Sequence, residues 1–83
     1  VLTVDRFGNV QLAAGPEHLA GLGERLRGGD VPALRGTTFA DAPAGGLVVY
    51  VDSAGWVAVA VNGGRAAVVL GVRPGDVLRL TPG

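Results

Sequence analysis

The sequence predicts a mainly β fold, a small antiparallel β-barrel or sandwich with one or two short helices. Its clearest strands are Leu47–Val51 and Trp56–Val61, two runs rich in β-branched and aromatic residues. Residues typical of tight turns recur throughout, and 15 of the 83 residues are glycine. Short strands separated by frequent glycine-containing turns indicate this class of fold, but they do not predict its topology.

The N-terminal part is expected to form two strands followed by a helix. Leu2–Val4 and Val10–Ala13 are the predicted strands, joined by a turn or bulge at Phe7–Asn9, because glycine and asparagine tolerate a positive φ. Glu17–Leu26 is a predicted helix, since its leucines recur at the i, i+3, i+7 spacing of one helical face. Two glycines inside this stretch weaken the helix.

The middle of the chain is predicted to form turns, short strands and a loop. A turn is expected at Gly28–Asp30, followed by a short strand at Val31–Leu34 whose proline would confine it to a sheet edge. Thr37–Ala42 is a possible further strand, and Pro43–Gly46 is a loop.

The C-terminal half begins with the two clearest strands, which Asp52–Gly55 should join as a hairpin turn. Gly64–Leu70 fits either a buried strand or one to two helical turns, and its flanking glycines favour the helix. Pro and Gly at the centre of Arg73–Asp76 predict a type II turn. Val77–Leu80 is the last predicted strand.

Composition excludes several classes of function. Seven acidic residues balance seven arginines, so the chain lacks the basic excess of a nucleic-acid-binding protein. It has no cysteine, which rules out disulfides and thiolate sites, and a single histidine cannot build a metal site unaided.

Length and hydropathy predict one small domain over residues 1–83. The longest apolar run, Trp56–Val61, is too short to span a bilayer, and no signal peptide is expected. We therefore expect a cytoplasmic protein without a membrane partner. The chain starts at Val1 rather than at a methionine, which suggests a piece of a longer protein.

The sequence offers few residues for catalysis. His18 is more typical of a solvated surface residue than of a general base. Asp5 and Asp52 are candidates for a carboxylate pair, but both stand at strand ends, where aspartate is ordinary turn chemistry. Asn62–Gly64 lacks the remaining residues of a phosphate-binding loop.

Ligand contacts are more credible than catalytic groups. Phe7 and Phe39 stand beside polar turn residues and could either fill the core or stack on a flat ring. The amide of Asn9 can donate and accept at once, as an adenine edge requires, although Asn9 and Asn62 also fit plain turn positions. Ser53 could simply hydrogen-bond the hairpin backbone.

Four segments in order resemble one known family. They are Val-Asp-Arg-Phe-Gly-Asn (4–9), Thr-Phe-Ala-Asp-Ala (38–42), Asp-Ser-Ala-Gly-Trp (52–56) and Ala-Val-Asn-Gly-Gly-Arg-Ala-Ala-Val-Val-Leu-Gly (60–71). Together they look like the C-terminal domain of the S-adenosyl-L-methionine (SAM) hydroxide adenosyltransferase family, which includes related fluorinating and chlorinating enzymes.

The resemblance implies a C-terminal β-barrel that follows a larger α/β domain absent from this chain. It implies a homotrimer whose active sites lie between the C-terminal domain of one subunit and the N-terminal domain of its neighbour. Water, or halide in the halogenating members, displaces methionine from C5′ of SAM without a metal or redox cofactor. In the water-using branch the products are adenosine and L-methionine.

The resemblance also implies residue roles around the adenine. Phe7 and Phe39 match aromatics that flank the ring, and Asn9 matches an amide that recognises the adenine edge. Gly63 matches a position whose backbone meets adenine, with Asn62 beside it.

At the methionine end, Asp5 matches the carboxylate that binds the substrate amine, and Ser53 matches a hydroxyl near its carboxylate. Ala54 stands where halogenating relatives carry an arginine, which favours water as the nucleophile. One residue, Arg6, separates Asp5 from Phe7, whereas halogenating members have two there.

These observations predict the adenosine-binding domain of a SAM hydrolase, inactive alone because the residues that would activate water belong to the missing domain. The alternatives are a domain of a SAM-dependent halogenase and a non-enzymatic barrel that serves as a binding or oligomerisation module.

Overall fold

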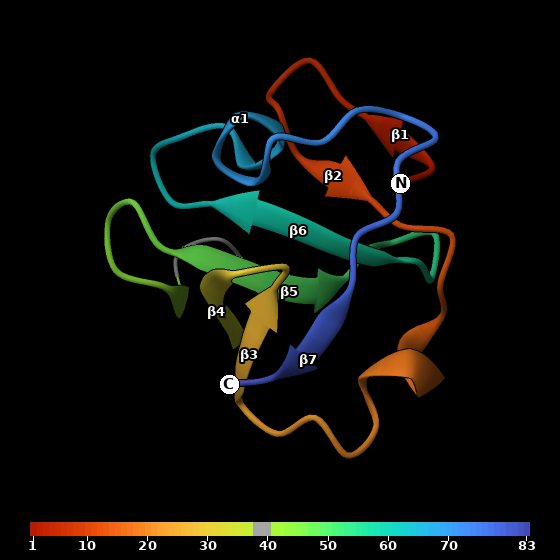
Figure 1. Cartoon of the computed structure of the whole chain (residues 1–83), viewed down its shortest axis with the longest axis vertical. Coiled ribbons are helices and arrows are strands. Elements are labelled where there is room, and N and C mark those ends of the chain that lie inside the picture. The colour runs from red at the N-terminus through yellow and green to blue at the C-terminus, as the bar shows by residue number, and fades with distance from the viewer. Residues whose placement is uncertain (38–40) are drawn as a thin grey trace.

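The computed structural model describes residues 1–37 and 41–83, and most of its regular structure is β (Figure 1). The elements are, in chain order, β1 (Thr3–Val4), β2 (Val10–Gln11), the 3₁₀ helix η1 (Pro16–Leu19), β3 (Arg25–Gly28), β4 (Val31–Arg35), β5 (Leu47–Val51), β6 (Val57–Val61), α1 (Ala66–Leu70) and β7 (Leu80–Pro82). Within the described residues the strands form one sheet in the order β1-β2-β6-β5-β4-β3-β7. The predicted mainly β class with short helical segments is confirmed.

The sheet is mainly antiparallel, as predicted, but one pair of strands makes it mixed. β4 and β5 run parallel, with Ala33 opposite Leu47, whereas the other neighbouring strands are antiparallel. The physical reason is the long connection between β4 and β5, which lets the chain return before it re-enters the sheet.

The described sheet has two end strands, β1 and β7, and no ladder joins them within residues 1–37 and 41–83. The N-terminal residue Val1 nevertheless contacts the turn that precedes β7, at Gly75 and Asp76. Gly75 N donates to Val1 O at 2.9 Å, and the amino group of Val1 donates to Asp76 O. Closure into the predicted barrel stays a prediction.

The predicted helix over Glu17–Leu26 is largely wrong. Only η1 is helical, and Arg25–Gly28 is strand β3. Gly21 and Gly23 lie between them with φ of +81° and +80°, a left-handed conformation that ends a right-handed helix. The leucine spacing nevertheless marks buried positions, since Leu19 and Leu26 are both in the core.

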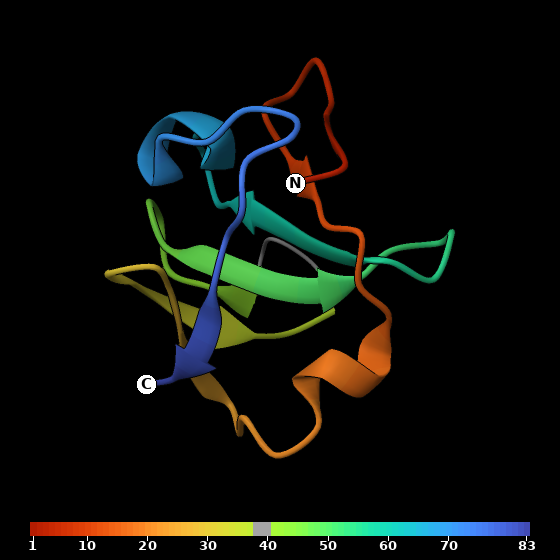
Figure 2. The same ribbon diagram turned by 45° about the vertical axis from the view of Figure 1, so that its right-hand side comes forward.

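The predicted edge position of Val31–Leu34 is also wrong, because β4 lies between β3 and β5 (Figure 2). Arg35 N donates to Glu24 O, so alternate residues of β4 turn their N–H groups toward β3, and Pro32 is not among them. On its other side the ladder with β5 begins only at Ala33. The missing N–H of Pro32 therefore leaves no gap in either ladder.

Two further predicted strands are not observed as predicted among the described residues. Thr37, Asp41 and Ala42 lie in no strand, and the rest of the predicted strand Thr37–Ala42 lies outside the described residues. The last strand begins at Leu80 rather than Val77, whose side chain is exposed.

The remaining turn and helix predictions are confirmed. α1 occupies most of Gly64–Leu70 and ends at Gly71, whose left-handed conformation caps it. In the turn at Arg73–Asp76, Asp76 N donates to Arg73 O and Gly75 has a φ of +91°, as a type II turn requires.

The main cluster of buried side chains lies on one face of the sheet, and β6 is buried on both faces along its whole length. The buried residues that pack together are Val10, Leu12, Leu19, Leu26, Ala33, Leu47, Val49, Val57, Val59, Val61 and Ala66. The small side chains of Ala58 and Ala60 alternate with the core valines of β6 and face the other way. Among the described residues, no helix has the length and apolar character needed to cross a membrane.

Candidate functional site

The turn between β1 and β2, residues Asp5–Asn9, holds three of the predicted site residues. Asp5 Oδ1 accepts hydrogen bonds from Phe7 N at 2.9 Å and Asn9 N at 3.0 Å. Asp5 Oδ2 accepts from Asn9 Nδ2 at 3.2 Å. Gly8 completes the turn with a φ of +83°, and its N–H donates to Asp5 O. The predicted turn at Phe7–Asn9 is therefore confirmed, with the Asp5 carboxylate at its centre.

This turn rests on the start of α1. Ala67 N donates to Gly8 O at 3.0 Å, and the Arg65 guanidinium donates to Arg6 O at 2.9 Å. The fit is close, because a Cβ on Gly8 would lie 2.6 Å from Arg65 Cβ. The backbone that presents Phe7 is thus braced from behind by the helix.

A wide, open hollow lies beside the turn, and we call it the ring-side hollow. Its lining residues are Phe7, Asn9, Val61, Gly63, Gly64 and Arg65. Phe7 is 63 % exposed, with the Arg6 guanidinium 5.1 Å from its ring centroid. An aromatic face, an amide and glycine backbone can together hold a flat, polar-edged ring.

A smaller depression adjoins it and shares Asn9; we call it the polar hollow. Its lining residues are Thr3, Asp5, Asn9, Gln11, Tyr50, Asp52 and Ala58. Burial raises the pKa of the Tyr50 hydroxyl, and the negative charges of Asp5 and Asp52 raise it further. The hydroxyl therefore stays protonated at neutral pH and can donate a hydrogen bond.

The second turn on the polar hollow, Asp52–Trp56 between β5 and β6, is the predicted hairpin turn. Asp52 Oδ1 accepts from Ala54 N at 2.9 Å and Trp56 N at 3.1 Å, while Oδ2 accepts from Gln11 Nε2 at 2.8 Å. The pKa of Asp52 is lowered chiefly by the Gln11 bond, with the backbone N–H groups adding to it. Aspartate at both strand ends is turn chemistry, as the sequence indicated.

The structure brings Phe7, Asn9 and Gly63 onto one hollow and places Asp5 on its neighbour. It does not bring Ser53 and Ala54 there: both are exposed in the hairpin turn and line neither hollow. Ala54 contributes only its backbone N–H, to Asp52.

The other two predicted site residues are Asn62 and Phe39. Asn62 has a structural contact, since its Nδ2 donates to Ala42 O at 2.8 Å and its backbone pairs with Gly45 and Gly46. Its amide is therefore engaged with the 42–46 loop rather than with the ring-side hollow. Phe39 lies outside the described residues.

Sequence reasoning did not single out Arg65, Tyr50 or Gln11 as site residues. Arg65 directly follows the glycine pair at 63–64, and this position beside a predicted site glycine could have indicated it as a site residue. Tyr50 and Gln11 sit within ordinary strand patterns, and only the pairing of β2 and β5 with β6 places them on the polar hollow.

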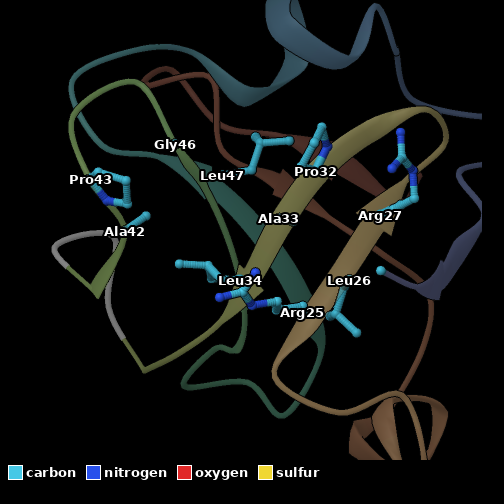
Figure 3. A pocket seen from close by; sticks show the side chains of 11 residues that line it. Arg25, Leu26, Arg27, Pro32, Ala33, Leu34, Ala42, Pro43, Gly46 and Leu47 are labelled. Atoms are coloured by element: carbon cyan, nitrogen blue, oxygen red, sulfur yellow. The ribbon is translucent and has the colours of Figure 1, made fainter.

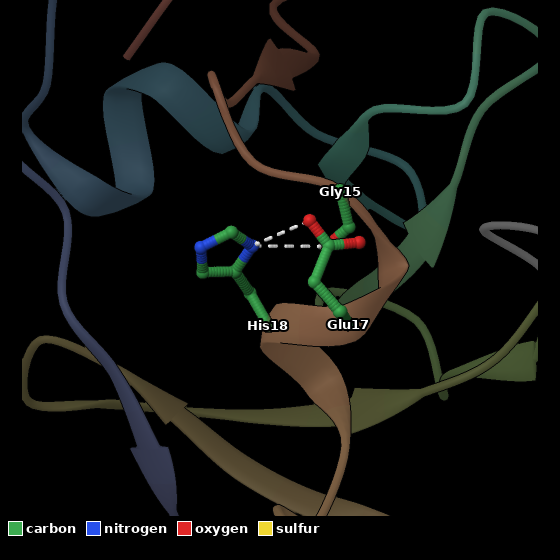
Figure 4. Close-up of polar contacts among 3 residues, drawn as sticks. All are labelled: Gly15, Glu17 and His18. Atoms are coloured by element: carbon green, nitrogen blue, oxygen red, sulfur yellow. Dashed lines mark hydrogen bonds and ion pairs between the residues drawn. The ribbon is translucent and has the colours of Figure 1, made fainter.

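His18 is exposed on η1, where its Nδ1 lies 3.4 Å from Glu17 Oε1 and 3.3 Å from Gly15 O (Figure 4). These are local contacts within three residues, as expected for a surface histidine. Within the described part of the chain, no three histidine or acidic side chains gather as a metal site would require.

A third hollow lies over β3 and β4, bordered by the 42–47 segment (Figure 3). Its lining is mostly apolar, and its charged residues are Arg25 and Arg27, the latter donating to Asp30 O at 2.9 Å. None of the predicted site residues that the structure describes lines it, and its arginines would repel a cationic ligand.

Known proteins resemble this chain over most of its length. A family model described as the SAM hydroxide adenosyltransferase C-terminal domain matches residues 1–79. Proteins named (R)-S-adenosyl-L-methionine hydrolase are 64 % identical in Salinispora arenicola and 61 % identical in Salinispora tropica, in each case over the whole chain. A Thermus thermophilus protein of the same name is 42 % identical over 96 % of the chain. The chain spans about a third of these relatives, 32 %, 32 % and 30 % of their lengths.

Solved structures agree with the fold. A structure described as an uncharacterized conserved protein from Thermotoga maritima superposes with a TM-score of 0.80 at 35 % identity, over 94 % of this chain and 33 % of that one. A conserved hypothetical protein from Thermus thermophilus superposes with a TM-score of 0.73 at 39 % identity, over 96 % of this chain and 33 % of that one.

Proposed function

We propose a function from family membership: this chain belongs to the SAM hydroxide adenosyltransferase C-terminal domain family. Its proposed role is to bind the adenosyl group of SAM within a longer enzyme, over residues 1–83 as a single C-terminal domain. That enzyme would convert SAM and water to adenosine and L-methionine.

The observation that carries the proposal is the ring-side hollow. Phe7, Asn9 and Gly63 come from two segments more than fifty residues apart, yet they line one hollow. Phe7 offers a ring face, and Asn9 offers a donor and an acceptor. No atom of the described residues lies within 4 Å of a Cβ placed on Gly63, so a ligand can approach the backbone there. This is the combination that adenine binding needs.

The polar hollow supports a cationic substrate. SAM carries a positive sulfonium and an ammonium group, and the carboxylates of Asp5 and Asp52 face the hollow that adjoins the ring-side hollow. In the reaction, a water oxygen bonds to C5′, the C5′–sulfur electron pair passes to sulfur, and one proton leaves the water. Neither a metal nor a redox cofactor takes part in this displacement.

This domain would contribute positioning rather than acid–base chemistry. Fixing the adenine directs C5′ toward the attacking oxygen. Orienting two reactants in this way can lower the activation barrier by several kcal/mol. The groups that activate water are proposed to lie in the α/β domain of a neighbouring subunit, in a cytoplasmic homotrimer whose barrel closes between β1 and β7. Phe39 and Ser53 keep their proposed roles at the adenine and the methionine carboxylate.

Water is the proposed nucleophile because Ala54 offers no guanidinium where halogenating relatives carry one. The test incubates the full-length protein with SAM in halide-free and chloride buffers and separates the products by chromatography. Adenosine in both buffers, without a 5′-chloro product, is the expected result. A 5′-chloro product would favour the halogenase, and no turnover by a folded trimer would favour a non-enzymatic module.

A further inference from the structure

We propose that Asp5 is a positioning residue for nucleobase specificity, because its carboxylate fixes the orientation of the Asn9 amide. This inference rests on the proposed function and deepens it. It differs from the role that family resemblance gives Asp5, which is to bind the substrate amine.

The contacts of Asp5 carry the proposal. Its Oδ1 is occupied by Phe7 N and Asn9 N, and its Oδ2 accepts from Asn9 Nδ2 at 3.2 Å. All three contacts lie within the turn, and two of them come from Asn9. The carboxylate therefore engages the backbone of the turn with one oxygen and the Asn9 side chain with the other.

The equivalent turn at Asp52–Trp56 shows that capping the turn backbone does not require a bond to a side chain within the turn. Asp52 Oδ1 makes the same pair of backbone contacts, two and four residues ahead, so one oxygen is enough to form this turn. The second oxygen of Asp52 binds Gln11 on another strand. The bond from Asp5 to the Asn9 amide is therefore an addition to the turn and not a requirement of it.

The chemistry of the bond decides which way the amide faces. A carboxylate can only accept, so Asn9 must turn its N–H group toward Asp5. The amide oxygen and the second N–H remain for a ligand, and Asn9 borders the ring-side hollow. Adenine presents an amino donor beside a ring-nitrogen acceptor, whereas hypoxanthine presents an oxygen in place of the amino group. A fixed amide can distinguish the two, and a rotating amide distinguishes them poorly.

The substitution Asp5→Asn isolates this function. Its side-chain oxygen can still cap the turn, but its new NH₂ group faces Asn9 and repels the Asn9 N–H, so the Asn9 amide is expected to flip. We expect the ratio of kcat/KM for SAM to that for its 6-oxo (inosine-type) analogue to fall about tenfold in the full-length protein. Asp52→Asn is the matched control: it makes the same change in the equivalent turn. Because it removes a charge from the polar hollow, it should change kcat/KM equally for both substrates and leave this ratio unchanged.

A double-mutant cycle tests whether Asp5 acts through Asn9. If it does, Asn9→Ala lowers the ratio, and adding Asp5→Asn to Asn9→Ala lowers it no further. An equal loss for both substrates in Asp5→Asn, with the ratio intact, would overturn the proposal and favour binding of the substrate amine. That result leaves SAM hydrolysis itself standing.

Failure of the proposed function would look different. If the wild-type protein does not turn over SAM but binds adenosine, the same ratio is measured by calorimetry with adenosine and inosine, and the same outcomes apply. If the wild-type protein binds neither nucleoside, both proposals are overturned.

Discussion

The β1–β2 turn and the β5–β6 turn have the same backbone design and different surroundings. In each, an aspartate caps N–H groups two and four residues ahead, and a glycine with a φ of +83° or +86° stands at the fourth position. Gly8 is closed in by Arg65, whereas no atom of the described residues lies within 4 Å of a Cβ placed on Gly55. The turn motif alone therefore does not make a site. What differs is the packing behind the turn and the side chains it presents.

The strongest predicted effect is on protein stability, and it differs between the glycines of the two turns. Gly8→Ala should destabilise the protein by about 3 kcal/mol, because the left-handed conformation is strained and the new Cβ would lie 2.6 Å from Arg65 Cβ. Gly55→Ala carries the same backbone strain without the clash and should cost about 1 kcal/mol. The midpoints of urea unfolding measure both. Equal losses would mean that α1 does not brace the β1–β2 turn.

The next prediction concerns adenosine affinity, which should depend on the aromatic residue of one turn and not on that of the other. Phe7→Ala should weaken adenosine binding about tenfold with little loss of stability, because the ring is 63 % exposed and its stacking partner would be the ligand. Trp56→Ala is the control: it removes the aromatic ring of the other turn and should leave adenosine affinity unchanged. Isothermal titration with adenosine measures both. If Phe7→Ala binds adenosine as tightly as the wild type, the ring-side hollow is not the adenine site.

The smallest effect concerns protonation of the β5–β6 turn. The pKa of Asp52 lies below its ordinary value because Gln11 and the backbone N–H groups stabilise the charged form. Ionised Asp52 therefore stabilises the fold above about pH 4, and the contribution is lost as the pH falls through the lowered pKa. Carboxyl-carbon NMR should show that titration, and Gln11→Ala should move it upward. A pKa of Asp52 that Gln11→Ala leaves unchanged would exclude Gln11 as the cause.

Much of the local structure could be predicted because local chemistry determines it. Asp52–Gly55, Phe7–Asn9 and Arg73–Asp76 carry the residues that their turns require, and β5 and β6 are rich in valine. The prediction of a helix over Glu17–Leu26 was wrong because the leucine spacing indicates burial rather than helix. Two glycines in the left-handed conformation end the helix before Leu26.

The mixed sheet and the site depend on long-range pairing, which sequence patterns do not specify. No local signal gives the parallel pairing of β4 with β5, or the position of Pro32 inside the sheet. Side-chain chemistry made Phe7 and Asn9 candidate ligand contacts, and resemblance to a family added Gly63. The structure supplies what neither gives: the hydrogen bonds of Asp5 and the contact of Arg65 with the turn. The structure also shows that Asn62 holds the 42–46 loop, through hydrogen bonds of its side chain and its backbone.

Adenine recognition by the β1–β2 turn is best tested by an NMR titration of the full-length, ¹⁵N-labelled protein with adenosine. We expect the largest shifts at the Phe7 and Asn9 amides, the Asn9 side chain, and Gly63 and Gly64, with the Asp52–Trp56 turn unaffected. Shifts that centre on the Asp52–Trp56 turn, or on the hollow over β3 and β4, would contradict the claim that the β1–β2 turn recognises the adenine.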